Sequence, residues 1–214
     1  MRFVLISTVA FVSAAHAATI SVGNEGFGGG QNNWPGGEPP SAVIDGAGQK
    51  YLNFGGENTG FVVTPTAGGI PASITAWAAN DAIERDPASF WLGGTNGDSV
   101  TGDYTFIAGG LFSLPDTRNG GGTAELLEEN SSSVSFVNSA SFTSYLVVFP
   151  TLKNAGAANS MQVADVQLFD AAGTGIFAPG DTILGVQVDG ALVPEPSTGL
   201  LAFLGLAGLL RRRR

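Results

Sequence analysis

Apolar residues along the chain gather in short runs of four to nine residues, and glycine and proline stand between the runs. The runs are rich in Val, Ile, Phe, Thr and Tyr, and their length and spacing are typical of an all-β sandwich. Only residues 125–130 have the pattern of a helical turn. We therefore expect antiparallel sheets without crossover helices, arranged as a jelly roll. The expected strands are Phe61–Thr64, Ala72–Ala78, Ser89–Leu92, Tyr104–Ala108, Val134–Val137, Tyr145–Phe149, Met161–Phe169 and Ile183–Val188.

The longest of these runs changes its alternation midway. Its apolar positions are first odd-numbered, at Met161 and Val163, and then even-numbered, at Val166 and Leu168. Strand side chains alternate strictly between two faces, so this change of phase predicts a β-bulge near Asp165. A bulge commonly redirects a side chain, and here that side chain is a carboxylate.

The first 17 residues have the three regions of a secretory signal peptide. Arg2 supplies the positive charge, Phe3–Ala15 the apolar helix, and Ala15-His16-Ala17 the small-residue cleavage site. We expect signal peptidase to cut between Ala17 and Ala18, so that the protein is exported across the inner membrane. The alternative, a buried N-terminal strand, does not explain why the three regions occur in this order.

The last 22 residues combine a rigid tripeptide, an apolar run and a cationic end. Pro194-Glu195-Pro196 precedes the uncharged segment Leu200–Leu210, and Arg211–Arg214 follow it. Four arginines hold their end of such a segment on the cytoplasmic side of a membrane. At about 1.5 Å per residue the apolar helix spans roughly 20 Å, less than the ~30 Å hydrocarbon core. We expect a short transmembrane helix that anchors the chain transiently, rather than a C-terminal core helix.

The two ends therefore act as sorting signals, and the protein between them forms one domain. We expect a signal peptide at 1–17, a β-sandwich domain at 18–192 and a sorting tail at 193–214. The part between the signals has four basic and 17 acidic side chains, a net charge of −13. This charge argues against nucleic acid, which proteins bind through lysine and arginine. It suits a secreted protein that binds divalent cations or simply stays soluble.

Two residue types needed for common catalytic sites are missing between the signals. The chain has no cysteine, and its one histidine, His16, belongs to the predicted signal peptide. Ser-His-Asp and Cys-His catalysis and the usual zinc sites are therefore excluded for the mature protein. An enzyme would have to rely on carboxylates.

The order of parts in the tail resembles the PEP-CTERM sorting tail of exopolysaccharide-producing Gram-negative bacteria. This resemblance implies that a membrane-embedded exosortase recognises Pro194, Glu195 and Pro196 and removes the tail. The protein is then expected at the cell surface, in the cell envelope or outside the cell.

Three segments of the core resemble discoidin-like, galactose-binding-like β-sandwich domains. They are Asn33–Gly46, Ala79–Phe90 and Asn159–Leu168, and the likeness extends over most of Asn32 to Asp170. The resemblance implies an eight-stranded jelly roll whose end loops bind sugars or other ligands, often beside a structural calcium ion.

The same resemblance implies calcium ligands at Asp45 and Asp165, with carbonyl oxygens from Ala42 and Gln49. Calcium takes six to eight oxygens, so a loop and a distant carboxylate suit it. This chain departs from the family, because Ala47 stands where a second acid is frequent, the loop is one residue short and Gln49 replaces a threonine. The alternative is that Asp45 only forms a turn before a glycine.

Five other residues suit either a binding or a structural role. Trp34 lies in a Gly/Pro-rich loop and is the candidate for stacking on a sugar, whereas Trp77 and Trp91 fall in expected strands and suit a core. Glu84 and Asp86 form either a catalytic or metal-binding pair or a loop fixed by ion pairs. The pattern favours the ion pairs.

These observations predict a secreted protein with a non-catalytic binding or structural role, in exopolysaccharide or biofilm. A carbohydrate-binding module is the first alternative and would use Trp34. A glycan-active hydrolase is the second, and it needs two carboxylates facing one cleft.

Overall fold

The computed structural model describes residues 18–190, so the predicted signal peptide and sorting tail lie outside the described residues. Thr19–Asp189 form one compact unit. Among the described residues, no helix has the length and apolar character of a membrane span. The strands are β1 (Thr19–Val22), β2 (Asn24–Glu25), β3 (Asn33–Trp34), β4 (Tyr51–Asn53), β5 (Thr59–Thr64), β6 (Ser73–Trp77), β7 (Ser89–Thr95), β8 (Thr105–Leu111), β9 (Ser131–Ser135), β10 (Ser144–Phe149), β11 (Met161–Val163), β12 (Asp165–Phe169) and β13 (Thr182–Asp189).

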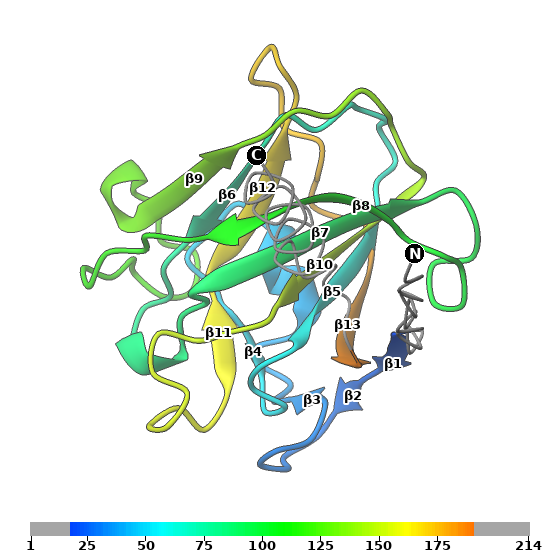
Figure 1. The fold of residues 1–214 in the computed structure, drawn as a ribbon. Helices are drawn as coiled ribbons and strands as arrows, with labels where there is room; N and C mark the ends of the chain where they lie inside the picture. The colour runs from blue at the N-terminus through cyan, green and yellow to red at the C-terminus, as the bar shows by residue number, and fades with distance from the viewer. Residues whose placement is uncertain (1–17, 191–214) are drawn as a thin grey trace, which may run out of the picture. The chain divides into compact units, whose positions relative to one another are not determined.

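The larger sheet has six antiparallel strands in the order β1-β13-β5-β10-β7-β8 (Figure 1). Its central strands β5 and β10 are buried at nearly every position. A strand covered on both faces needs a continuous apolar sequence, which explains why these two runs were the plainest in the chain. The first and last strands pair with each other, so both ends of the unit lie at one place in the sheet.

The second layer is a three-stranded sheet in the order β12-β6-β9, beside the pair β11-β4. Apolar side chains from both layers form the core, among them Phe61, Tyr145 and Leu168. In β6, Ile74 and Ala76 belong to this core. The three remaining β6 residues point to the opposite face of the sheet, because strand side chains alternate. The expected antiparallel β-sandwich is therefore confirmed.

The change of phase in the longest run falls at the predicted position and coincides with a change of sheet. The strand breaks at Ala164, where β11 ends its pairing with β4 and β12 begins its pairing with β6. The chain passes from one sheet to the next, and the core lies on the other side of the strand after the break. The Ala164 N–H donates a 3.0 Å hydrogen bond to the carbonyl of Trp77, the residue with which Asp165 is paired. Two residues therefore oppose one, as in the β-bulge that the sequence predicted, and the bulge accompanies the change of partner.

Each of the eight apolar runs overlaps a strand of the structure, and the longest run contains both β11 and β12. The pattern missed strands that are short or polar. The strand expected at Val134–Val137 is β9, which begins three residues earlier in a serine-rich segment. Strands β1 to β4 were not expected, and β2 and β3 pair in parallel. Short 3₁₀ helices form at Pro40–Ile44 (η1), Ile83–Arg85 (η2) and Glu128–Asn130 (η3), the last within the expected helical turn.

Candidate functional site

Asp45 and Asp165 lie at neighbouring positions although they are far apart in the sequence. Asp45 follows η1, and the turn continues through Gly46, whose φ of +73° is a conformation that glycine adopts freely. The Gly46 N–H donates a hydrogen bond of 2.8 Å to Asp165 Oδ2. The Ala47 N–H donates one of 2.8 Å to Asp45 Oδ1. The loop therefore rests on the first residue of β12, as the resemblance implied.

The electrostatics of this acidic pair are unfavourable without a cation. Asp165 is only 3% exposed, and burial together with the negative charge of Asp45 raises the pKa of Asp165 to about 8. Burial also raises the pKa of Asp45 above its ordinary value. None of the ion pairs between residues 18 and 190 involves either carboxylate. A bound cation would relieve this repulsion.

The residues of the pair fit a calcium ion with few protein carboxylates. The Ala42 carbonyl accepts only a long 3.5 Å contact from the Asp45 N–H, so it keeps acceptor capacity for an ion. The Gln49 side chain instead donates to the Gly37 carbonyl, which leaves its main-chain carbonyl as the possible ligand. Within the described part of the chain, no cluster contains three or more His, Cys, Asp or Glu side chains suited to a metal. The calcium site stays a prediction with two carboxylates, and carbonyls or water would complete it.

Trp34 is half-buried at the edge of the sandwich. Its ring meets the ring of Tyr51 edge-on, with the centroids 6.2 Å apart. It also packs so closely on Gly23 and Gly185 that a Cβ at either glycine would lie within 2.6 Å of it. The ring borders a small, mainly apolar hollow of about 260 Å³ between β1, η1 and β13. Part of the indole therefore serves packing, and a ligand role for Trp34 stays a prediction.

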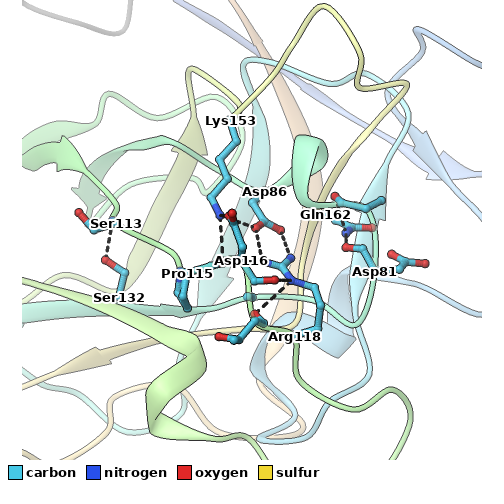
Figure 2. A network of polar contacts seen from close by, with 12 residues as sticks. Asp81, Asp86, Ser113, Pro115, Asp116, Arg118, Ser132, Lys153 and Gln162 are labelled. Atoms are coloured by element: carbon cyan, nitrogen blue, oxygen red, sulfur yellow. Dashed lines mark hydrogen bonds and ion pairs between the residues drawn. The ribbon is translucent and has the colours of Figure 1, made fainter.

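The polar loop around Glu84 and Asp86 is fixed by ion pairs (Figure 2). Asp86 is fully buried, and both of its oxygens accept hydrogen bonds of 2.8 Å from the Arg118 guanidinium. Lys153 Nζ lies 3.2 Å from Asp86 Oδ2. Burial raises the pKa of Asp86, and the two cations oppose the rise. A carboxylate enclosed in this way holds three segments together, which supports the structural interpretation of this loop.

A second polar cluster joins the same region to η1 and β11. Buried Lys50 places its Nζ 2.7 Å from Asp81 and 3.5 Å from Glu38. Gln162, fully buried in β11, donates to the main-chain carbonyl of Asp81, a contact drawn in Figure 2. Arg85 reaches Gln162 Oε1 at 3.5 Å. All four basic residues between the predicted signals thus engage polar partners within the domain.

A wide groove lies on the face of the three-stranded sheet that points away from the core. This groove has a volume of about 790 Å³. Alternate residues of β6 and β9 form its floor, including Trp77, Thr75 and Ser133. Sequence reasoning missed it, because it placed Trp77 in the core and began β9 at Val134. Serines 131, 133 and 135 share this face, but they lie in a run with Ser132, so the sequence carries no alternation that would have marked it. Trp91, in contrast, is buried as expected.

Comparison with known proteins identifies the tail. Residues 192–214 match the family model described as the PEP-CTERM protein-sorting motif. The tail predicted from its order of parts is therefore confirmed, and the match begins one residue before Val193. A comparison with curated proteins found no match.

Solved structures similar to this chain are carbohydrate-binding domains of low sequence identity. One is the family 32 CBM from Clostridium perfringens NanJ in complex with galactose, 12% identical, covering 71% of this chain and 91% of its own, with a TM-score of 0.42. A second is CpGH89CBM32-5 from the same organism in complex with GalNAc-β-1,3-galactose. It is 12% identical, the match covers 72% of this chain and 94% of its own, and the TM-score is 0.45. A third is chitosan-binding module 1 from a chitosanase/glucanase of Paenibacillus sp. IK-5. It is 9% identical, the match covers 72% of this chain and 93% of its own, and the TM-score is 0.43. The likeness concerns the fold alone.

Proposed function

We propose that this chain is an exported substrate of an exosortase. The observation that carries the proposal is the match of residues 192–214 to the protein-sorting motif. Signal peptidase removes residues 1–17, and the apolar tail inserts transiently in the inner membrane. Exosortase then recognises Pro194-Glu195-Pro196 and separates the tail from the domain at 18–192. The domain reaches the cell surface or the extracellular matrix.

At that location the domain has a non-catalytic binding or structural role in exopolysaccharide or biofilm. Support comes from the lack of histidine and cysteine after residue 16, and from the enclosure of Asp86 in ion pairs. Polysaccharide is the partner most consistent with an acidic domain that presents aromatic side chains in hollows. The half-exposed edge of Trp34 is the site that the sequence predicted for this contact.

The sorting proposal is tested in the native host with Glu195→Ala. Intact-mass measurement of the released protein gives its C-terminus, and membrane fractionation shows how much precursor stays behind. We expect the variant to remain membrane-associated with its tail intact, whereas the neighbouring change Ser197→Ala leaves processing unchanged. An identical mature C-terminus in Glu195→Ala and wild type would show that this tripeptide is not the recognition element.

The non-catalytic role is tested by measuring the release of reducing ends from soluble polysaccharides. We expect no turnover by the purified protein. The wide groove does hold two carboxylates, Glu128 and Asp170. Turnover that is lost in Glu128→Gln or Asp170→Asn would establish the hydrolase alternative in place of the binding role.

A further inference from the structure

The groove on the three-stranded sheet has a regular floor that follows from strand register. Trp77 is paired with Ser131 of β9, Thr75 with Ser133, and Ser73 with Ser135. Paired residues in an antiparallel sheet point to the same face, so these six side chains line one surface. From Ser73 to Trp77 the floor is about 13 Å long, at ~3.3 Å per residue. This length accommodates a short stretch of a linear polymer.

Two loops border this floor, one at its Trp77 end and one at its Ser73 end. The segment before β9 contributes Leu126 and Glu128, and the turn after β12 contributes Asp170, Ala171 and Gly173. Hydrogen bonds from Ala172 and Thr174 N–H to Asp170 Oδ1, 2.9 and 2.8 Å long, fix the second loop. The volume of about 790 Å³ falls within the ~300–1,000 Å³ range of ligand sites.

The groove has aromatic side chains at its two ends and hydroxyl groups between them. Trp77 lies at one end, and Phe136 and Phe169 lie at the other, each half-buried with part of its ring at the surface. Ser133 is exposed at the centre, where its Oγ is 2.7 Å from Thr75 Oγ1. Each hydroxyl donates one hydrogen bond and accepts two, so this pair retains free capacity. A pyranose chain offers the matching surface, with apolar C–H faces and hydroxyl edges.

The charges of the groove indicate which polymer fits. Its charged lining residues are Glu128 and Asp170, and no basic residue is among those that line it. The domain as a whole is strongly acidic, and two of its four basic residues, Arg118 and Lys153, are paired with Asp86. An anionic polysaccharide would be repelled, whereas hydroxyls of an uncharged sugar can donate to the two carboxylates.

We infer that this groove binds a segment of uncharged polysaccharide, with Trp77 and Phe169 contacting sugar faces and Ser133 and Thr75 contacting sugar hydroxyls. The site lies on the open face of the sheet and is distinct from the hollow beside Trp34. It shares with the proposed function only the class of ligand, so each can fail without the other.

The inference is tested by affinity electrophoresis of the purified protein in gels containing laminarin, galactomannan or hydroxyethyl cellulose, with alginate as the anionic comparison. We expect retardation by at least one uncharged polymer and none by alginate. Trp77→Ala should weaken binding at least tenfold. Ser133→Arg fills the groove from an exposed position and should weaken binding as strongly, whereas Ser139→Arg, outside the groove, should not. Thermal unfolding of each variant confirms that it is folded.

Other outcomes distinguish the groove from the remaining surface. If wild type is retarded and only Trp34→Ala removes the effect, the groove is not the site although polysaccharide binding stands. If Ser133→Arg binds like wild type, the groove is likewise rejected. If none of the three uncharged polymers retards the wild-type protein, the inference is overturned, while the sorting proposal is unaffected.

Discussion

Asp86 gives the sharpest test of what holds this domain together. Asp86→Asn is nearly isosteric and removes only the negative charge. It leaves the Arg118 and Lys153 side chains, which are 16% and 20% exposed, facing a neutral amide at 2.8 and 3.2 Å. Removing one partner of a buried ion pair typically costs about 3–5 kcal/mol, because the remaining charge is desolvated without compensation. For a domain of this size the midpoint temperature should fall by about 6–20 °C.

The assay is urea unfolding followed by tryptophan fluorescence, which gives both the midpoint and its slope. Asp116→Asn is the matched control, since Asp116 also lies 3.2 Å from Lys153 Nζ but its side chain is 81% exposed. An exposed pair contributes about 0–1 kcal/mol, so the control should unfold almost like wild type. A loss below about 1 kcal/mol in Asp86→Asn, with an unchanged slope, would refute the structural role assigned to this carboxylate.

Two further predictions concern the acidic pair. Between the ordinary carboxyl pKa and about 8, Asp165 is protonated in the folded protein and ionised in the unfolded protein. The folded state therefore binds more protons, and the free energy of unfolding falls as the pH rises through this window, by up to about 1.4 kcal/mol per pH unit. With chelator present, the gain in stability of Asp165→Asn over wild type in urea unfolding should be larger near pH 8 than near pH 5. The same difference at both pH values would contradict the raised pKa. Calcium at a hundredfold excess over its Kd should stabilise the wild-type protein by about 2.7 kcal/mol, enough to raise the melting temperature by several degrees. Asp45→Asn should remove that gain, and the same melting temperature with calcium and with chelator in wild type would show that Asp45 is only a turn residue.

Local sequence patterns predicted those features whose cause lies within a few residues. Strands β5 and β10 were located because a strand buried on both faces must be apolar throughout. The tail was recognised because its tripeptide, apolar run and arginines are read in order along the chain. The predicted start of β9 was three residues too late, because the serines at its beginning carry no apolar signal and only the pairing with β6 shows which of them share a face.

The sites depended on contacts between distant segments, which a local pattern does not contain. The sequence contained Asp86 and its two cations, but only the fold brings Arg118 and Lys153 to one buried carboxylate. The proximity of Asp45 and Asp165 was predicted through a family resemblance rather than from the residues themselves.

What the sequence by itself determined was the class of fold, the C-terminal sorting tail and the lack of histidine and cysteine after residue 16. These follow from hydrophobic periodicity, residue order and composition, each of which is a property of the chain before it folds. Only the tertiary structure decided that the chain changes sheets at Ala164, so that Asp165 and Trp77 pair across β12 and β6. The registers of β12 and β9 against β6 decide which side chains of these three strands face the groove. Which residues share a face depends on strand register, and register is set by the packing of the whole sandwich.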